Sequence, residues 1–485
     1  MVATRSYDVL VIGSGSGEII TDAAVAQGLR VALVDKGPLG GTCANVGCIP
    51  TKMIITAADR VLEIEEADRL YIEAKVTHIG FRDIMERMRR YRAEGRQRMR
   101  HAIEEAENLD YYNQQARFVG ERTLDVNGVT IRGDMVFVVA GARPLVPPVD
   151  ELDRFPYLDN ESVLDLEERP DSLVVIGGGY IACELAHFFS AMGTAVTIIQ
   201  RNERLVPDEE PEISERLLEV LSRRVVVHTA TEAVEVRQER GDYVVITRDR
   251  DGAEGQVRGE RLLVAAGRRG NADLLDVGAT GVEADRRGYI RVNDYLEAGV
   301  PGIWALGDVI GKQMFKHVAN REARFAWHNS QHEERVAVDY AMTPHAVFTH
   351  PQIASVGLTE AEARKDHDVL VGLAHYTDVV KGYALAAEEG LAKAVVDAES
   401  RRILGFHIIG PYAPILIQEV VDVMAVDGRA SALSFGMHIH PALPEVVEKA
   451  LNSLERTERT PNSLAAARCS FSRCAATWPG RMQGS

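Results

Sequence analysis

The sequence has few cysteines, few aromatic residues and no long apolar segment. Five cysteines among 485 residues are too few for the disulfide framework of a small secreted protein. No hydrophobic run approaches the roughly 20 residues that a membrane-spanning helix needs. The N-terminus leads directly into a strand-like segment at residues 7–12, without a signal-peptide pattern. We therefore expect a cytoplasmic protein with no membrane partner.

Positive charge is also scarce. Against 72 acidic residues the chain has 55 lysines and arginines, which gives a formal net charge of −17. General attraction to nucleic acid or to anionic lipid is therefore not expected. Eight arginines nevertheless fall in a helix predicted over residues 81–107. That helix is either a solvated face or a positively charged wall for an anionic substrate.

The remaining composition is that of a folded protein with several domains. Hydrophobic residues make up 46% of the chain and charged residues 26%, both near the averages for globular proteins. At roughly 100–200 residues per domain, the length corresponds to two to four domains. Disorder as the main state is therefore excluded.

Two segments repeat one layout, in which a β-branched run, a glycine-rich turn and an amphipathic helix lead to a second β-branched run. The first covers residues 7–35 and contains Gly13-Ser-Gly15, and the second covers residues 172–200 and contains Gly177-Gly-Gly179. Glycines let the backbone approach a pyrophosphate, and the helix N-terminus supplies amide groups and a partial positive charge. One such turn is weak evidence because tight turns before helices are common. Two of them predict two α/β dinucleotide-binding units.

The two repeats end in different residues. Asp35 closes the first, where a carboxylate can accept hydrogen bonds from ribose hydroxyl groups. Gln200 and Arg201 stand at the equivalent place in the second. A cation without an acid suits a ribose that carries a 2′-phosphate, which favours NADP(H) over NAD(H). The alternative is that Arg201 is simply solvated.

Two cysteines, Cys43 and Cys48, lie in the glycine-dense stretch at residues 40–52, just before a helical pattern at residues 50–62. This stretch, the two repeats and the Gly307-Asp308 pair together resemble the FAD-dependent pyridine nucleotide-disulfide oxidoreductases. That family includes glutathione reductase, dihydrolipoamide dehydrogenase, mycothione reductase and mercuric reductase. The resemblance extends from about residue 7 to about residue 454.

The resemblance implies that Cys43 and Cys48 form a redox-active disulfide beside FAD. Cys43 would be the interchange thiol that attacks substrate, and Cys48 the thiol that contacts the flavin. A short loop that enters a helix brings two thiols together, and the helix N-terminus stabilises a thiolate. A structural zinc site is the competing interpretation, but no second Cys or His pair lies nearby to complete it. We expect no metal.

Further catalytic residues follow from the same resemblance. Lys52 would lie near the flavin and pair with Glu184. His440 matches the acid-base histidine and Glu445 the carboxylate that orients it, since glutamate raises the basicity of the imidazole. In the family this pair reaches into the active site of a second copy, so we expect a homodimer with shared active sites.

The resemblance also predicts the cofactor sites and the domains. Tyr180 would gate the nicotinamide pocket, and Asp308 would hydrogen-bond the flavin ribityl chain. The predicted cofactor-binding residues are Gly13, Gly15, Asp35, Lys36, Gly41, Thr42, Lys52, Gly141, Gly177, Gly179, Tyr180, Arg201, Gly267 and Asp308. The predicted domains are an FAD domain at 1–145 and 265–340, an NAD(P) domain at 146–264, an α+β dimerisation domain at 341–455 and a disordered tail at 456–485.

One residue departs from the expected pattern. Glu18 stands where a third glycine normally lets the helix pack closely against the strand. This places a carboxylate near the predicted pyrophosphate. We interpret the change as a feature of one branch of the family, because mycothione reductases also depart from glycine there.

The expected activity is electron transfer from NADPH, or NADH, through FAD and the disulfide to a low-molecular-weight disulfide, similar to mycothione reductase. The alternative is dihydrolipoamide dehydrogenase, which shares the catalytic residues but normally has an acid at the position of Gln200. Mercuric reductase comes third, because it delivers mercury through a vicinal cysteine pair, whereas Cys469 and Cys474 are separated. A flavoprotein that only binds or regulates would not need Cys43, Cys48 and His440.

Overall fold

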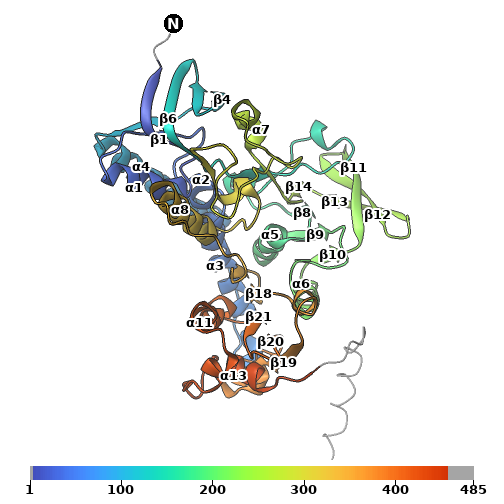
Figure 1. The fold of residues 1–485 in the computed structure, drawn as a ribbon. Helices are drawn as coiled ribbons and strands as arrows, with labels where there is room; N and C mark the ends of the chain where they lie inside the picture. Colours follow the sequence, from blue (N-terminus) through green and yellow to red (C-terminus); the bar gives the residue numbers. More distant parts are fainter. Residues whose placement is uncertain (1–3, 457–485) are drawn as a thin grey trace, which may run out of the picture.

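We describe the fold from a computed structural model, which places residues 4–456 (Figure 1). The predicted tail, with Cys469 and Cys474, lies beyond residue 456 and outside the described residues. No described helix is both long enough and apolar enough to cross a membrane. The description below follows the chain through three main sheets.

The first sheet has seven strands. Six follow the order β3-β2-β1-β6-β5-β4, and β16 also pairs with β6. Its central strands are parallel and buried, as expected for continuous runs of valine, leucine and isoleucine. The strands are β1 (Arg5–Ile12), β2 (Val31–Val34), β3 (Leu109–Tyr112), β4 (Ala116–Gly120), β5 (Thr123–Val126), β6 (Val129–Val138) and β16 (Ile303–Ala305).

The second sheet repeats the parallel arrangement on a smaller scale. Its four strands run in the order β10-β9-β8-β14, and a three-stranded antiparallel sheet, β11-β12-β13, packs beside it. The strands are β8 (Ser172–Ile176), β9 (Ala195–Ile199), β10 (Val226–His228), β11 (Thr231–Glu239), β12 (Asp242–Asp249), β13 (Glu254–Gly259) and β14 (Arg261–Val264). The fold is therefore α/β with two dinucleotide-binding units, as the sequence predicts.

The chain passes between these two sheets at neighbouring points. Strand β7 (Ala142–Pro144) on the outward passage pairs antiparallel with β15 (Arg268–Gly270) on the return. The predicted domain limits at 145 and 265 fall beside these two strands. Both passages line the same cavity, so the connection between the units forms part of the site.

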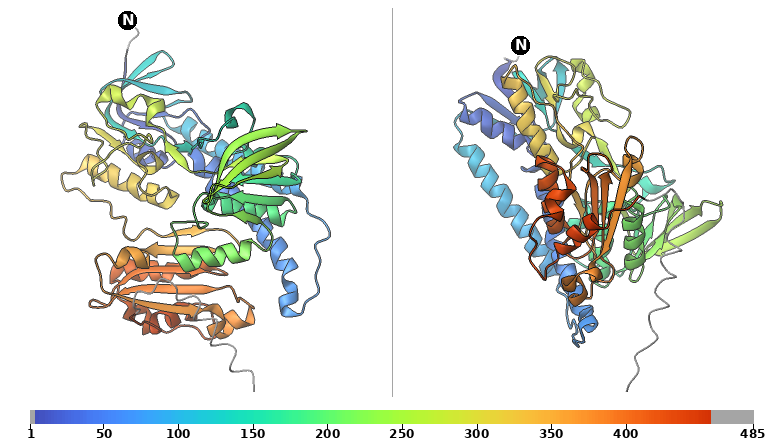
Figure 2. Two further views of the ribbon diagram at one scale, coloured as in Figure 1. Left: turned by 90° about the vertical axis from the view of Figure 1, so that its right-hand side faces the viewer. Right: turned by 60° about the horizontal axis from the view of Figure 1, so that its bottom comes forward.

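The third sheet is antiparallel, in the order β17-β18-β21-β20-β19, and lies apart from the other two at the bottom of Figure 1. Figure 2 shows its strands and helices stacked as a separate layer. Its elements are β17 (His345–Val347), β18 (Ile353–Gly357), α9 (Glu360–Ala363), β19 (Val369–His375), α10 (Val380–Ala384), β20 (Leu391–Asp397), β21 (Ile403–Ile409), α11 (Ala413–Val426), α12 (Ala430–Ser434) and α13 (Glu445–Asn452).

The remaining helices join the sheets to one another. Helices α3 and α5 share one core with the second sheet and with β17 and β18, so the cysteine-bearing segment is anchored to the second and third sheets. These helices are α1 (Gly17–Ala26), α2 (Gly41–Asn45), α3 (Cys48–Glu65), α4 (Phe81–Glu105), α5 (Tyr180–Ala191), α6 (Pro211–Leu221), α7 (Ala272–Leu275) and α8 (Lys316–Gln331).

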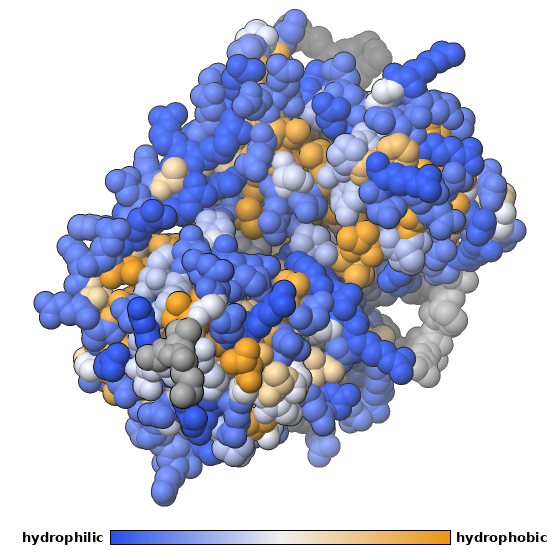
Figure 3. Space-filling model, turned by 90° about the horizontal axis from the view of Figure 1, so that it is seen from above, coloured by the Kyte–Doolittle hydropathy of each residue, from blue (hydrophilic) through white to orange (hydrophobic). Residues whose placement is uncertain are grey.

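The arginine-rich helix α4 behaves mainly as a surface element. It buries Phe81, Met85 and Met88, and it directs Arg89 and Arg92 to the segment at residues 165–166. Among the described residues that line the central cavity, none belongs to α4. Figure 3 shows a face that is mostly hydrophilic, with small separated hydrophobic patches. The contacts of α4 and its absence from the cavity lining favour the solvated-face interpretation of this helix.

Candidate active site

A cavity of about 1110 Å³ lies where the two dinucleotide-binding units and the third sheet meet. Such a volume exceeds that of a typical small-ligand pocket and suits an extended dinucleotide. Thirteen of the residues predicted from sequence line it, namely Gly13, Gly15, Asp35, Lys36, Gly41, Thr42, Cys43, Cys48, Lys52, Gly141, Tyr180, Glu184 and Asp308.

The glycine turn after β1 brings backbone against backbone. Gly13 has φ +104°, and a Cβ atom there would lie 2.2 Å from the carbonyl oxygen of Val139. A Cβ atom on Gly41 would lie 2.8 Å from the Cα of Gly15. Asp35 supports the turn, since its Oδ2 accepts hydrogen bonds from the amide and the hydroxyl of Ser14 at 2.7 and 2.6 Å. Only glycine fits these positions, and the turn is open toward the cavity.

Glu18 is accommodated because the close helix-to-strand contact is made one residue earlier. A Cβ atom on Gly17 would lie 2.8 Å from Cγ1 of Val11, so Gly17 allows the close approach of helix to strand that the third glycine normally allows. Burial raises the pKa of Glu18, and Nζ of Lys316 opposes this effect at 3.8 Å. Lys316 also donates a hydrogen bond to Oγ of Ser16 at 3.2 Å. A cation therefore offsets the carboxylate beside the turn.

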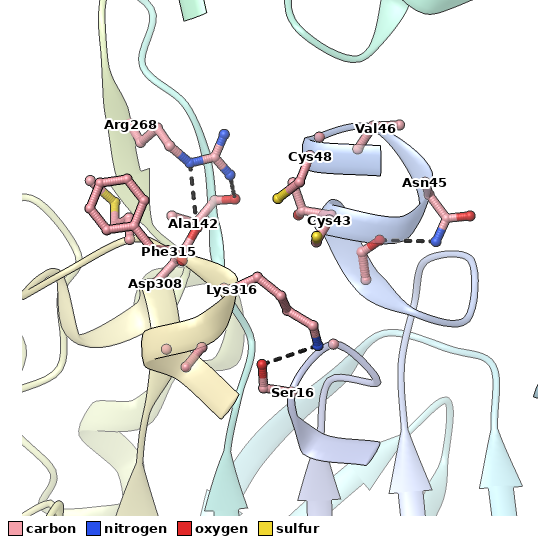
Figure 4. Close-up of a pocket in the computed structure, with 18 of the residues that line it drawn as sticks. Ser16, Cys43, Asn45, Val46, Cys48, Ala142, Arg268, Asp308, Phe315 and Lys316 are labelled. Atoms are coloured by element: carbon pink, nitrogen blue, oxygen red, sulfur yellow. Dashed lines mark hydrogen bonds and ion pairs between the residues drawn. The ribbon is translucent and has the colours of Figure 1, made fainter. Parts of the chain in front are cut away.

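The two cysteines face the cavity from adjacent helices (Figure 4). Cys43 lies in the short helix α2, and Cys48 is the first residue of α3. Both are free thiols in the structure. The hydrogen bond between them lowers the pKa of Cys48 to about 7, with Lys52 adding to the effect, and raises that of Cys43. Cys48 is thus the thiolate of the reduced pair, as a residue at a helix N-terminus should be.

Lys52 lies one turn after Cys48 and pairs with Glu184 of α5. Its Nζ donates to both carboxylate oxygens, at 2.9 and 2.7 Å. The amide of Phe348 donates to the same carboxylate at 2.9 Å, and Glu184 is 4% exposed. The pair is therefore held by three parts of the fold, and it lies in the wall of the cavity.

Asp308 and Arg268 form the opposite wall. Asp308 follows β16, and Nε of Arg268 lies 3.7 Å from its Oδ2. Burial raises the pKa of Asp308, and within residues 4–456 its carboxylate accepts no hydrogen bond. Nε of Arg268 is likewise buried without a hydrogen-bond partner. The Asp308 carboxylate and Nε of Arg268 are thus buried without hydrogen-bond partners, which fits a ligand rich in hydroxyl groups, such as a ribityl chain.

The second unit has the same turn but a more open end. A Cβ atom on Gly177 would lie 2.3 Å from the carbonyl oxygen of Ala265, and α5 begins directly after Gly179. Gly267 has φ +121° in the turn after β14. Arg201 is exposed and makes no ion pair within the described chain. This unit therefore offers a free cation at the end of β9.

His440 and Glu445 are close to each other but not to the cysteines of their own chain. Nδ1 of His440 lies 2.7 Å from Oε1 of Glu445, and the amide of Ala442 donates to the other oxygen at 2.9 Å. The bond with His440 lowers the pKa of Glu445. The His440 side chain is 69% exposed, and neither residue is among those that line the cavity.

The C-terminal region that contains this pair also exposes large apolar side chains. Exposed apolar residues of the same region include Ile415, Val426, Phe435, Met437 and Ile439. A patch of this kind marks a surface that another protein covers. Nearby, His438 lies between Glu419 and Glu448, with nitrogen-to-oxygen distances of 3.5 and 3.6 Å.

Comparisons with known proteins agree with this geometry. A family described as pyridine nucleotide-disulphide oxidoreductase matches residues 7–323, and the dimerisation domain of the same family matches residues 343–451. The chain belongs to the pyridine nucleotide-disulphide oxidoreductase family. The resemblance seen in the sequence is therefore confirmed.

Several members of the pyridine nucleotide-disulphide oxidoreductase family are similar along nearly the whole chain. Mycothione reductase of Mycobacterium tuberculosis is 37% identical over 93% of this chain and 100% of its own. Dihydrolipoyl dehydrogenase of Thermus scotoductus is 32% identical over 93% and 98%. The solved Cu(II) complex of the flavoprotein disulfide reductase RclA from Escherichia coli is 26% identical over 93% and 99%, with a TM-score of 0.83.

Membership defines the chemistry at the coarse level. The protein is a flavin-dependent disulfide oxidoreductase that acts on sulfur groups with FAD and NAD(P)H, and it carries the family's dimerisation domain. Two features of its site were missed from sequence. Arg268 directly follows Gly267 in a turn that the resemblance already marked, so its position was a usable signal. Lys316 gave no such signal, because its partners Ser16 and Glu18 are about 300 residues away.

Proposed function

We propose that this enzyme reduces a low-molecular-weight disulfide with NADPH, in the manner of a mycothione reductase. The observation that carries the proposal is the pair Cys43 and Cys48, which faces a dinucleotide-sized cavity with Cys48 as the favoured thiolate. The 37% identity to mycothione reductase over its full length supports the substrate class. The free cation at Arg201 supports NADPH as the electron donor.

The residues around the cavity would hold FAD between the two walls. The turn from Gly13 to Ser16 would bind the pyrophosphate and Asp35 a ribose, while Asp308 would accept hydrogen bonds from the ribityl hydroxyls. Bound FAD would supply the two-electron transfer from the nicotinamide to the cysteine disulfide. Lys52, held by Glu184, would place its positive charge beside the ring and beside the Cys48 thiolate.

The sulfur chemistry then belongs to the two cysteines. Cys43 loses its proton to His440 of a second copy and attacks one sulfur of the substrate disulfide. A mixed disulfide forms at Cys43, and the departing thiolate takes the proton from His440. The Cys48 thiolate attacks Cys43, which restores the disulfide and releases the second half of the substrate as a thiolate that takes its proton from water. One disulfide, two electrons and two protons give two thiols.

His440 needs a second copy of the chain to take part. It is exposed, its partner Glu445 fixes the proton on Nδ1, and the same C-terminal region exposes large apolar side chains. These features support a homodimer in which each active site takes its histidine from the other copy. A monomeric active enzyme would contradict this arrangement.

The test compares electron donors and acceptors on the purified, FAD-loaded enzyme. NADPH and NADH are each assayed with the disulfide of mycothiol, lipoamide and glutathione disulfide, and Cys43→Ser is the inactive control. We expect NADPH with the mycothiol disulfide to have the highest kcat/KM, and Cys43→Ser to lose at least about 1000-fold. If NADH with lipoamide were best by orders of magnitude, the enzyme would be a dihydrolipoamide dehydrogenase. The similarity to the Thermus scotoductus enzyme keeps that candidate second.

A further inference from the structure

Three aromatic rings are stacked in the cavity wall beside Tyr180. The ring of Phe315 lies between those of His317 and His345, with centroid distances of 5.6 and 5.5 Å and interplanar angles of 11° and 10°. Tyr180 approaches the same phenyl ring at 6.4 Å. All four residues line the cavity, and Phe315 lies across it from the cysteines in Figure 4. The stack is therefore a flat wall next to the predicted nicotinamide gate.

The outer ring of this stack is fixed by a buried carboxylate. Nε2 of His345 lies 2.6 Å from Oε1 of Glu209, which is 7% exposed. The other oxygen of Glu209 accepts a hydrogen bond from Oγ of Ser355 at 2.6 Å. Although burial acts in the opposite direction on both groups, their hydrogen bond lowers the pKa of Glu209 and raises that of His345. The two residues are a charged pair, which holds the imidazole in one orientation.

Glu209 also belongs to the segment that binds the other end of the dinucleotide. Residues 200–210 follow β9 and include Arg201, the predicted 2′-phosphate ligand. The amide of Val206 in this segment donates to the carbonyl of Gly178 in the glycine turn at 2.7 Å, and the amide of Glu209 donates to Val206 at 2.9 Å. One short segment thus connects the phosphate-binding turn to the ring stack.

We propose that the Glu209–His345 pair positions the nicotinamide end of NAD(P)H by holding Phe315 flat against the cavity. The inference rests on the proposed function, because it places the nicotinamide beside Tyr180. A planar ring needs a planar, rigid wall to keep its reactive carbon in line for hydride transfer. The pair carries no net charge, so it stiffens the wall without repelling a nicotinamide that becomes cationic when it loses hydride. Glu209 and His345 are positioning residues in this scheme.

A purely structural role is the rival explanation. His345 lies in β17 of the third sheet and Glu209 lies in the second unit, so the pair joins two parts of the fold. If the pair only joined these two parts, its loss would lower the free energy of unfolding and weaken the binding of both halves of the dinucleotide alike. If it positions the nicotinamide, only ligands that contain that ring should be affected.

The experiment measures binding to the FAD-loaded dimer by titration calorimetry. NADP⁺ is compared with 2′,5′-ADP, which lacks the nicotinamide, in wild type, His345→Asn, Glu209→Gln and the double variant. Ser355→Ala is the matched control, because it removes a hydrogen bond from the same carboxylate but keeps the pair. We expect each single variant to bind NADP⁺ about 10-fold more weakly, the size of one charge-assisted hydrogen bond. The 2′,5′-ADP affinity should stay within about twofold, and the double variant should lose no more than either single one.

Two results would overturn the inference. In one, both ligands weaken equally in His345→Asn and Glu209→Gln, which makes the pair a structural clasp. In the other, neither ligand changes. The proposed function can fail without the inference failing. If the wild-type enzyme prefers NAD⁺, the same variants are titrated with NAD⁺ and with ADP, and the same difference between the two ligands is expected. The KM for the disulfide should not change in either variant, because the sulfur side of the site is untouched.

Discussion

The two dinucleotide-binding units share a backbone plan and differ in what covers it. In each, a Cβ atom on the glycine after the first strand would collide with a carbonyl oxygen of the neighbouring crossover, at 2.2 Å for Gly13 and 2.3 Å for Gly177. Helix α8 covers the first turn. Oγ of Ser16 donates to Oδ1 of Asn320 in this helix at 2.9 Å and accepts from Lys316 at its start. The second turn is covered by its own unit, since the amide of Val206 donates to the carbonyl of Gly178 at 2.7 Å, and the exposed Arg201 follows β9 nearby in the sequence.

This difference matches two ways of using a nucleotide. A turn covered by a helix from a distant part of the chain suits a cofactor that stays bound, and a turn covered only by its own unit, with a free cation after β9, suits one that exchanges in every cycle. The backbone plan alone does not distinguish these uses, since both units have it. The covering elements do, and they come from distant parts of the chain.

The largest expected effect separates the units by the same substitution. Gly13→Val and Gly177→Val each force a side chain into a carbonyl at positive φ. Strain of about 3 kcal/mol corresponds to a loss of nucleotide affinity of roughly 100-fold or more. We expect Gly13→Val to be purified without FAD, and Gly177→Val to keep its flavin absorbance but lose reduction by NADPH.

A matched control exists in a surface turn. Gly128 has φ +86° but no atom within 4 Å of a built Cβ atom, so Gly128→Ala adds the backbone strain without the collision. It should keep both FAD and NADPH reduction. Loss of flavin from Gly177→Val would show that the units are not independent.

The next effect tests the open end of the second unit. Arg201→Ala should lower kcat/KM for NADPH by roughly 10- to 100-fold, because a hydrogen-bonded ion pair with a phosphate contributes about 1.5–3 kcal/mol. The value for NADH should hardly change. Steady-state kinetics with both nucleotides measures the ratio, and Arg258→Ala, at an exposed arginine of β13, is the control. An unchanged ratio would mean that Arg201 is only solvated.

A third prediction uses the cysteines that accompany the two units. Cys48 has its pKa lowered to about 7 by its bond with Cys43 and by Lys52, whereas burial raises that of Cys183 in α5 to about 12. The Cys48 thiolate is present above its pKa and is lost as the pH falls. In the two-electron-reduced enzyme, long-wavelength thiolate-to-flavin absorbance should therefore drop about tenfold between pH 8 and pH 6.

The substitutions for this test follow from the same contrast. Cys48→Ser should abolish the band and Cys183→Ala should leave it unchanged. Lys52→Met should move the midpoint to higher pH, because a nearby cation is removed. A band that does not depend on pH between 6 and 8 would place the thiolate elsewhere.

The smallest effect concerns the unusual acid of the first unit. Because Gly17 makes the close contact with Val11 and Lys316 offsets the charge, Glu18→Gln should change the dissociation constant of FAD by less than about threefold, as for other partly exposed ion pairs. Fluorescence titration of the apoprotein with FAD measures it. Gly17→Ala should weaken FAD binding more, and the reverse order would contradict the assignment of the close contact to Gly17.

Local pattern was enough to predict much of the fold. Continuous β-branched runs marked β1, β2, β8 and β9. The helix expected at 50–62 is longer, and it begins at Cys48. Cys43 lies in a helix of its own rather than in a loop, because Asn45 donates to the carbonyls of Leu39 and Gly41 and closes the turn. These hydrogen bonds leave no periodic signal.

The residues themselves therefore determined the two glycine turns, the cysteine pair and the cation at Arg201, because each depends on neighbours within a few positions. Tertiary structure alone decided that Glu209 meets His345 across 136 residues, that Lys316 balances Glu18, and that His440 lies outside the cavity lined by the cysteines of its own chain. Contacts of this kind depend on how separate units pack, and packing is not encoded in the spacing of residues along one segment.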